Sequence, residues 1–316
     1  MARPRIAPVS AARAYFAAQA LCGAAWWIAV FASTHVRWWT LGRWDPAVLV
    51  VPDALLFVGA SAVAAARTTR VAATVVTVWS ILVTIALAVT GLVDRVAGWG
   101  VVLMTTATVC SAAATATIRL GHIPTGWFFV GPFSFRPADD ASGARHLRRS
   151  LSQLVVFWTT FFVVVPLVLG AIESRLRLRS PLLDHTAVRV AGIVLFAAGS
   201  AVGLWACVTM ALRGRGTPLP AATARELVVA GPYRWVRNPM ALAGVFQTIG
   251  VGCIVASWTV VVVAVAGAVV WNELIRPTEE ADLAARFGAS YDAYTQAVAC
   301  WVPRRAALDR RALSRR

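Results

Sequence analysis

The sequence predicts an all-α, polytopic membrane protein with about eight transmembrane helices. Of its 316 residues, 59% are hydrophobic and only 14% are charged, and the mean hydropathy is +0.70. An ordinary soluble domain has about 45–50% apolar and about 25% charged residues. The apolar residues also fall into runs of about twenty, the length needed to cross the hydrocarbon core of a bilayer.

Eight apolar runs are predicted to be the membrane spans. In order, they are residues 14–32, 47–66, 71–93, 97–118, 151–172, 190–212, 240–256 and 258–275. The seventh is short, and only Ser257 separates it from the eighth. Together these two runs are too long for one span, so we expect a tight helical hairpin.

The distribution of arginine predicts that both termini lie in the cytosol. Arginines are frequent between alternate spans, at 67–70, 119–149 and 213–237, and again near the C-terminus; such clusters mark cytosolic loops. Arg175, Arg177 and Arg179 oppose this assignment, because they lie in a loop that it places outside the cytosol. The chain contains no lysine, a bias typical of a GC-rich bacterial genome, so we expect a multi-pass protein of the bacterial cytoplasmic membrane.

The net charge of +16 does not indicate nucleic-acid binding, because the arginines border apolar runs where they would contact anionic lipid headgroups. Membrane lipids are therefore the expected partners. The four histidines are dispersed and the cysteines form no CxxC pair, so no metal is expected.

The longest cytosolic connection, residues 119–150, contains prolines, glycines, Asp139 and Asp140. It predicts three parts: a four-helix membrane region of unassigned role at 1–118, the connection at 119–150, and a second membrane domain at 151–316. In the first part Asp53 lies near the outer end of a span. Such a residue either contacts headgroups, caps a broken turn or has a function.

Polar residues concentrate in two cytosolic segments, 213–240 and 271–303. In the second segment Glu273, Arg276 and Glu280 are spaced i, i+3 and i+7, which places them on one face of a regular helix. The simplest interpretation is an anchored loop and surface ion pairs. An acidic cluster opposite a glycine-rich, basic loop also suits a sulfonium or ammonium ligand.

Taken together, the two segments resemble the membrane methyltransferase superfamily that includes isoprenylcysteine carboxyl methyltransferases and phospholipid methyltransferases. The resemblance runs from about Arg213 to Pro303. Its elements are Gly216-Thr-Pro218 with Pro220, Leu227-Val228, Gly231-Pro-Tyr-Arg-Trp-Val-Arg-Asn-Pro-Met240, Glu279-Glu280, Leu283, Phe287-Gly288, Tyr291, Tyr294 and Val302-Pro303.

The resemblance implies that S-adenosylmethionine binds at the cytosolic side and that a lipophilic acceptor enters from the bilayer. The residues that it implies for the cofactor pocket are Gly231, Tyr233, Arg237, Asn238, Pro239, Glu279 and Glu280. Arg237, Asn238 and Glu280 are the implied catalytic residues. Asn238 stands where many members have histidine, and Ala241 near where tyrosine is common. An asparagine can bond to the cofactor but cannot act as a base.

Two alternatives stay open at this point. A membrane reductase of the sterol or steroid type is similar in its C-terminal helices but uses NADPH; the Glu279-Glu280 pair favours the methyltransferase. The other alternative is a transporter or scaffold without enzymatic activity, although few charged residues lie within the spans. No motif distinguishes an oxygen, nitrogen or sulfur acceptor.

Overall fold

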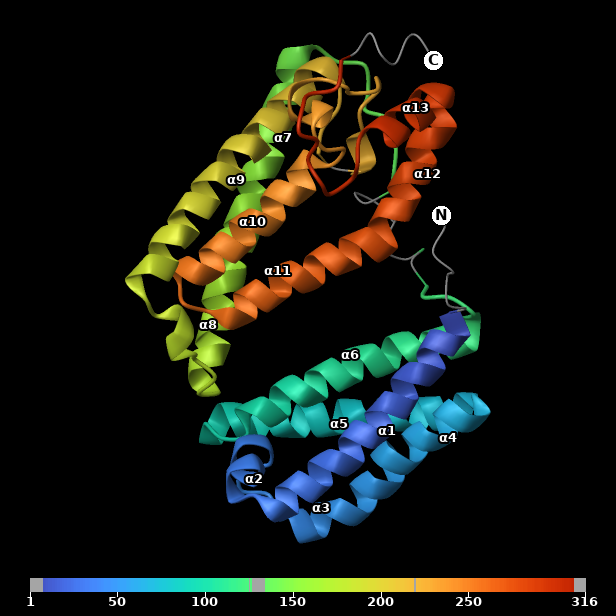
Figure 1. Ribbon diagram of the computed structural model, residues 1–316, viewed down its shortest axis with the longest axis vertical. Helices are drawn as coiled ribbons and strands as arrows, with labels where there is room; N and C mark the ends of the chain where they lie inside the picture. Colours follow the sequence, from blue (N-terminus) through green and yellow to red (C-terminus); the bar gives the residue numbers. More distant parts are fainter. Residues whose placement is uncertain (1–7, 125, 127–133, 219, 310–316) are drawn as a thin grey trace. The chain divides into compact units, whose positions relative to one another are not determined.

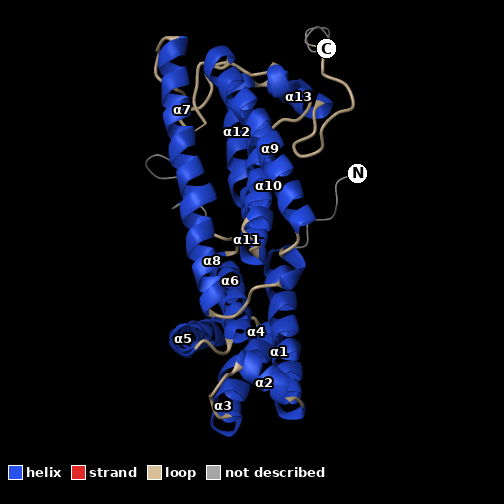
Figure 2. Cartoon of the chain, turned by 90° about the vertical axis from the view of Figure 1, so that its left-hand side faces the viewer, coloured by secondary structure: helices blue, strands red, loops and turns tan. Residues whose placement is uncertain are grey.

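The computed structural model describes residues 8–124, 126, 134–218 and 220–309. In these residues the chain is helical, with no strand beyond an isolated bridge between Pro137 and Thr223 (Figure 2). The chain divides into two compact units: Met1–Pro124 with Ile172–Leu178, and Thr125–Ala171 with Arg179–Arg316. The functional division at 118 and 150 stays a prediction.

Unit 1 consists of the N-terminal helices (Figure 1). They are α1 (Pro8–Ala32), α2 (Thr34–Thr40), α3 (Pro46–Asp53), a π-helical turn (Ala54–Gly59), α4 (Ala60–Arg67), α5 (Arg70–Asp94) and α6 (Gly98–Leu120). Helix α1 packs against α4 and α6, and α5 packs against α4 and α6. Phe16, Ala64, Ala73 and Val76 are completely buried between these helices. Small and aromatic side chains thus form the core of the unit.

Unit 2 is built around α9 (Thr186–Arg213), which packs against α10 (Pro239–Ile254) and α7 (Gly143–Thr159). A π turn (Thr160–Val164) joins α7 to α8 (Val165–Arg175). The other helices are α11 (Trp258–Val270), a π turn (Trp271–Ile275), α12 (Arg276–Phe287) and α13 (Ala289–Ala297). Gly192 and Gly250 allow α9 and α10 to approach closely, since a Cβ at Gly192 would lie 2.7 Å from the Gly250 carbonyl oxygen. Small residues at helix interfaces are typical of membrane proteins.

The structure confirms an all-α polytopic membrane protein. Seven helices in the described residues are long and apolar enough to cross a membrane, and the apolar helix Pro239–Ile254 is shorter. Large apolar side chains such as Leu21 and Val71 point outward, with 73% and 75% of their surface exposed. In a bilayer such side chains face lipid. The orientation of the termini stays a prediction.

The helices α10 and α11 confirm the predicted hairpin. They are separate, they contact each other, and the Ser257 side chain accepts a hydrogen bond from the Val260 amide at the start of α11.

Other predicted bounds were wrong. Helix α7 begins at Gly143, inside the segment expected to be a connection, because the Ser142 side chain caps it. The last long helix continues beyond 275 to Phe287 through a π turn.

Candidate functional site

An ion pair joins the two polar segments of unit 2, which lie far apart in the sequence. The Arg237 Nη2 and Glu280 Oε1 atoms are 3.2 Å apart, and the two side chains are only 16% and 31% exposed. Arg276 Nε lies 3.9 Å from the same carboxylate oxygen. The Arg237 amide also donates to the Ala299 carbonyl. The segment after α12 and the loop before α10 therefore pack together in unit 2, where their ribbons lie side by side in Figure 1.

The loop before α10 begins with a 3-10 turn, Gly231–Arg234. Gly231 has φ +50°, and a Cβ there would lie 2.5 Å from Thr209 Oγ1; both facts favour glycine. Tyr233 is buried, and its hydroxyl has no hydrogen-bond partner in the described residues. Burial raises the pKa of Tyr233 well above its usual value. The hydroxyl is therefore a buried, protonated donor at neutral pH.

Asn238 has a structural role that the sequence analysis did not foresee. It is the N-cap of α10, where its Oδ1 accepts a hydrogen bond from the Ala241 amide at 3.0 Å. Pro239, buried, is the first residue of the helix, a position that suits its fixed φ. The side-chain NH2 of Asn238 is a separate donor group. Capping accounts for an asparagine here, whatever the ligand.

Helix α12 presents Glu279 beside Glu280. Glu279 is partly buried and belongs to none of the ion pairs found among the described residues. Arg286, one helical turn beyond Asp282, forms an ion pair with it at 2.7 Å and donates to the Ala224 carbonyl. The hydrogen bond to Ala224 connects α12 to the loop that follows α9. Glu273, expected on the face of Arg276 and Glu280, is instead exposed and bonds to Asn272.

Two buried residues of α7 were not singled out by the sequence analysis. His146 and Ser150 lie one turn apart on α7, both completely buried. Neither ring nitrogen of His146 has a hydrogen-bond partner in the described part of the chain, and the Ser150 hydroxyl interacts with the Cys207 thiol. Buried polar atoms are nearly always bonded, so this pair marks a polar position within unit 2. The i, i+4 spacing of His146 and Ser150 in the sequence could have indicated that both lie on one face of a helix.

Tyr294 on α13 holds the site loop in place. Its hydroxyl donates to the Tyr233 carbonyl at 2.7 Å within a buried cluster. We expect Tyr294→Phe to lower the free energy of unfolding by about 1–2 kcal/mol, because a buried carbonyl loses its donor. Thermal unfolding of the purified protein would measure this loss. Tyr291→Phe is the matched control: Tyr291 is also buried on α13, but no hydrogen bond of its hydroxyl is found in the described residues. Equal losses in both variants would contradict the role of Tyr294.

The predicted site residues other than Glu279 thus divide into two groups. In the first group, Arg237 and Glu280 are in direct contact, and Tyr233 is held nearby by the hydrogen bond that its carbonyl accepts from Tyr294. Gly231, Asn238 and Pro239 shape the loop and the start of α10. The described residues contain no group of three or more histidine, cysteine, aspartate or glutamate side chains placed to hold a metal ion.

Comparison with known proteins identifies the region around this site. Residues 187–290 match the family model of phospholipid methyltransferase. No curated protein and no solved structure matches the chain significantly. The matched segment begins in α9, includes the loop with Arg237 and ends in α13. Residues 187–290 are therefore similar to the phospholipid methyltransferases, which are integral membrane methyltransferases.

Proposed function

We propose that the protein transfers a methyl group from S-adenosylmethionine to a lipophilic acceptor at the cytosolic face of a bacterial cytoplasmic membrane. The observation that carries the proposal is the Arg237–Glu280 ion pair, which connects the two segments whose motifs suggested a cofactor pocket. The match of residues 187–290 to a methyltransferase family supports the reaction type.

The residues present fit the polar end of this cofactor, which is a zwitterionic amino acid. Arg237 offers a guanidinium whose Nε is buried without a partner in the described residues, and guanidinium groups bind carboxylates well. Glu279 and Glu280 offer acceptors for an ammonium group or ribose hydroxyls. Tyr233 adds an unpartnered donor. A site with both signs of charge and free buried donors suits such a ligand better than a simple anion.

When bound, S-adenosylmethionine supplies an electrophilic methyl group on a sulfonium. The chain's own residues then have to position and shield the reactants, because displacement at a methyl group needs alignment and exclusion of water. We assign orientation of the cofactor to Arg237, Asn238 and Glu280. Asn238 does not take a proton from the acceptor, since an amide is not a base. If the acceptor is a carboxylate, Arg234 or Arg276 would orient it; Arg234 also donates through Nε to the Leu308 carbonyl.

Direct binding tests this function. Calorimetry on the detergent-purified protein should show saturable binding of S-adenosylmethionine and S-adenosylhomocysteine, without competition from NADPH. Folded protein that binds neither adenosyl ligand would refute the proposal. Binding of NADPH instead would indicate a membrane reductase.

A substitution series at Asn238 separates capping from cofactor binding. Asn238→Ala should lower the free energy of unfolding by about 1 kcal/mol, because it removes the cap. Asn238→Asp keeps a capping oxygen but loses the NH2 donor. We expect it to retain stability and to bind S-adenosylmethionine about tenfold more weakly, the value of one lost charge-assisted hydrogen bond. Unchanged affinity in Asn238→Asp would restrict Asn238 to capping.

A further inference from the structure

A cavity lies within unit 1, and none of the residues that line it is among those assigned to methyl transfer. It has a volume of about 380 Å³ and is lined by residues of α1, α3, α5 and α6 and of the segments between them. Four tryptophans, Trp26, Trp27, Trp44 and Trp79, contribute to its wall. Volumes of this order are typical of small-molecule sites, which are mostly apolar with a few placed polar groups.

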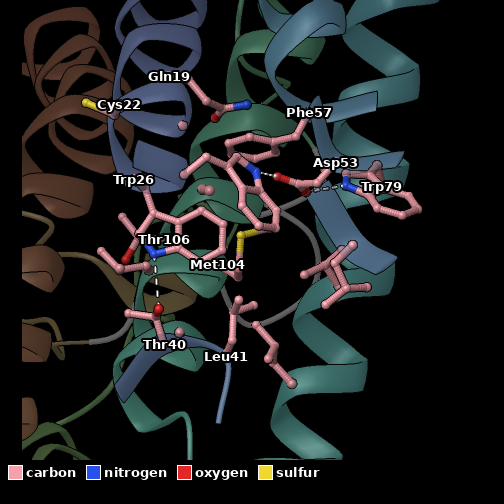
Figure 3. Close-up of a pocket in the computed structure, with 18 of the residues that line it drawn as sticks. Gln19, Cys22, Trp26, Thr40, Leu41, Asp53, Phe57, Trp79, Met104 and Thr106 are labelled. Atoms are coloured by element: carbon pink, nitrogen blue, oxygen red, sulfur yellow. Dashed lines mark hydrogen bonds between the residues drawn. The ribbon is translucent and has the colours of Figure 1, made fainter. Parts of the chain in front are cut away.

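Asp53 is the acidic residue in this wall. It lies at the end of α3, where the chain enters the π turn, and it is 8% exposed. This placement corrects the two structural interpretations of Asp53: it neither reaches headgroups nor caps a turn. Its Oδ2 accepts a hydrogen bond from Trp27 Nε1 at 2.8 Å and its Oδ1 accepts one from Trp79 Nε1 at 2.7 Å. Figure 3 shows the carboxylate beside the Trp79 nitrogen.

The carboxylate has acceptor capacity left but no cation. Each of its oxygens has about two lone-pair sites, and the indoles use one on each oxygen. None of the ion pairs of the described residues includes Asp53. The two indole hydrogen bonds do not cancel the charge of an ionised Asp53, and such a charge is costly in an apolar interior unless a proton or a cationic ligand neutralises it. The site therefore favours a ligand that brings positive charge.

The polar groups of Gln19 and Trp26 at the cavity have partners within the protein. The Gln19 amide nitrogen donates to Ser61, and its oxygen accepts from Ser111. Trp26 Nε1 donates to Thr40, as Figure 3 also shows. Each of these groups thus has a protein partner, and the Asp53 carboxylate in the wall disfavours an anionic ligand. Indole faces attract cations and also pack against apolar groups.

We infer that this cavity is a binding site for a lipophilic amine in its protonated form, with the ammonium group at Asp53 and the apolar body between the tryptophans. The site is separate from the proposed methyl transfer and does not depend on it. It gives the N-terminal helices, to which the sequence assigned no role, a ligand-binding function.

Three rigid probes of one shape test the inference: 1-aminoadamantane, 1-adamantanol and 1-adamantanecarboxylate. Equilibrium dialysis would measure the binding of each probe to the full-length protein in phosphatidylcholine nanodiscs, with empty nanodiscs subtracted. A primary aliphatic amine is protonated at neutral pH. We expect saturable binding of the amine, at least about tenfold tighter than that of the alcohol, and no saturable binding of the carboxylate. Equal binding of amine and alcohol would overturn the inference.

Two variants locate the bound probe. Asp53→Asn keeps the side-chain size and removes the charge, and it should weaken amine binding by about 10- to 100-fold with little effect on the alcohol. Ala18 also lines the cavity, and Ala18→Phe should abolish binding by filling the space while Asp53 is intact. Folding of each variant is checked by its elution profile and thermal transition. If Asp53→Asn does not fold, unchanged amine binding in folded Ala18→Phe overturns the inference.

Changing the lipid of the nanodiscs distinguishes two sources of the amine, a lipid headgroup and a free lipophilic amine. Repeating the dialysis in nanodiscs that contain phosphatidylethanolamine offers a lipid ammonium group as competitor. Loss of probe binding there would identify a lipid headgroup as the occupant, and unchanged binding would identify a free lipophilic amine.

Discussion

Replacing Glu280 with glutamine is expected to weaken S-adenosylmethionine binding by about 10- to 100-fold, the value of one hydrogen bond to a charged group. Glu280 Oε1 lies 3.2 Å from Arg237 Nη2 and 3.9 Å from Arg276 Nε. Glutamine keeps the size of the side chain but removes the negative charge. It therefore removes both the attraction for a cationic ligand and the partner that orients Arg237. Calorimetric titration of the purified variant would measure the effect.

Asp282→Asn is the matched control for Glu280→Gln. Asp282 also lies on α12, and its ion pair with Arg286 has similar exposure, 24% for Asp282 and 19% for Arg286. The same change of charge there should reduce stability and leave the dissociation constant of the cofactor within about twofold. If both variants weaken binding equally, the effect comes from the general charge of α12, and Glu280 is not a specific ligand.

Gly100→Ala is expected to destabilise unit 1 by about 3 kcal/mol, at the upper end for overpacking a tight contact. A Cβ at Gly100 would lie 1.9 Å from the Thr40 carbonyl oxygen. That oxygen belongs to the backbone at the end of α2, so a side-chain rotation cannot relieve the contact. The packing of α2 on α6 would have to open. Thermal unfolding in detergent would show a lower transition temperature.

Gly267→Ala serves as the control for a glycine without a packing role. Gly267 lies inside α11, and a Cβ there meets no atom within 4 Å. Alanine is favoured over glycine in a helix by about 1 kcal/mol, so this variant should be as stable as the wild type or more stable. A loss of stability in Gly267→Ala similar to that in Gly100→Ala would mean that close packing at Thr40 is not the cause.

The two halves of the chain differ in how far their function follows from the sequence. The motifs around Arg237 and Glu280 are sufficient to suggest a methyltransferase, and the match to phospholipid methyltransferase agrees. The N-terminal region offers only Asp53 as a signal. Its significance depends on Trp27 and Trp79, which lie on two other helices, and no local pattern in the sequence connects these three positions.

The sequence by itself determined the membrane class, the approximate spans and the hairpin of α10 and α11, because hydrophobic length and caps are local properties of the chain. Only the tertiary structure decided that Arg237 meets Glu280, that His146 is buried and that Glu273 turns outward. Contacts between distant segments cannot be read from a local pattern, and for Glu273 the local reason lies at residues 271–275. A π turn there interrupts the regular helical repeat, so the face predicted from i, i+3 and i+7 spacing is not the face that forms.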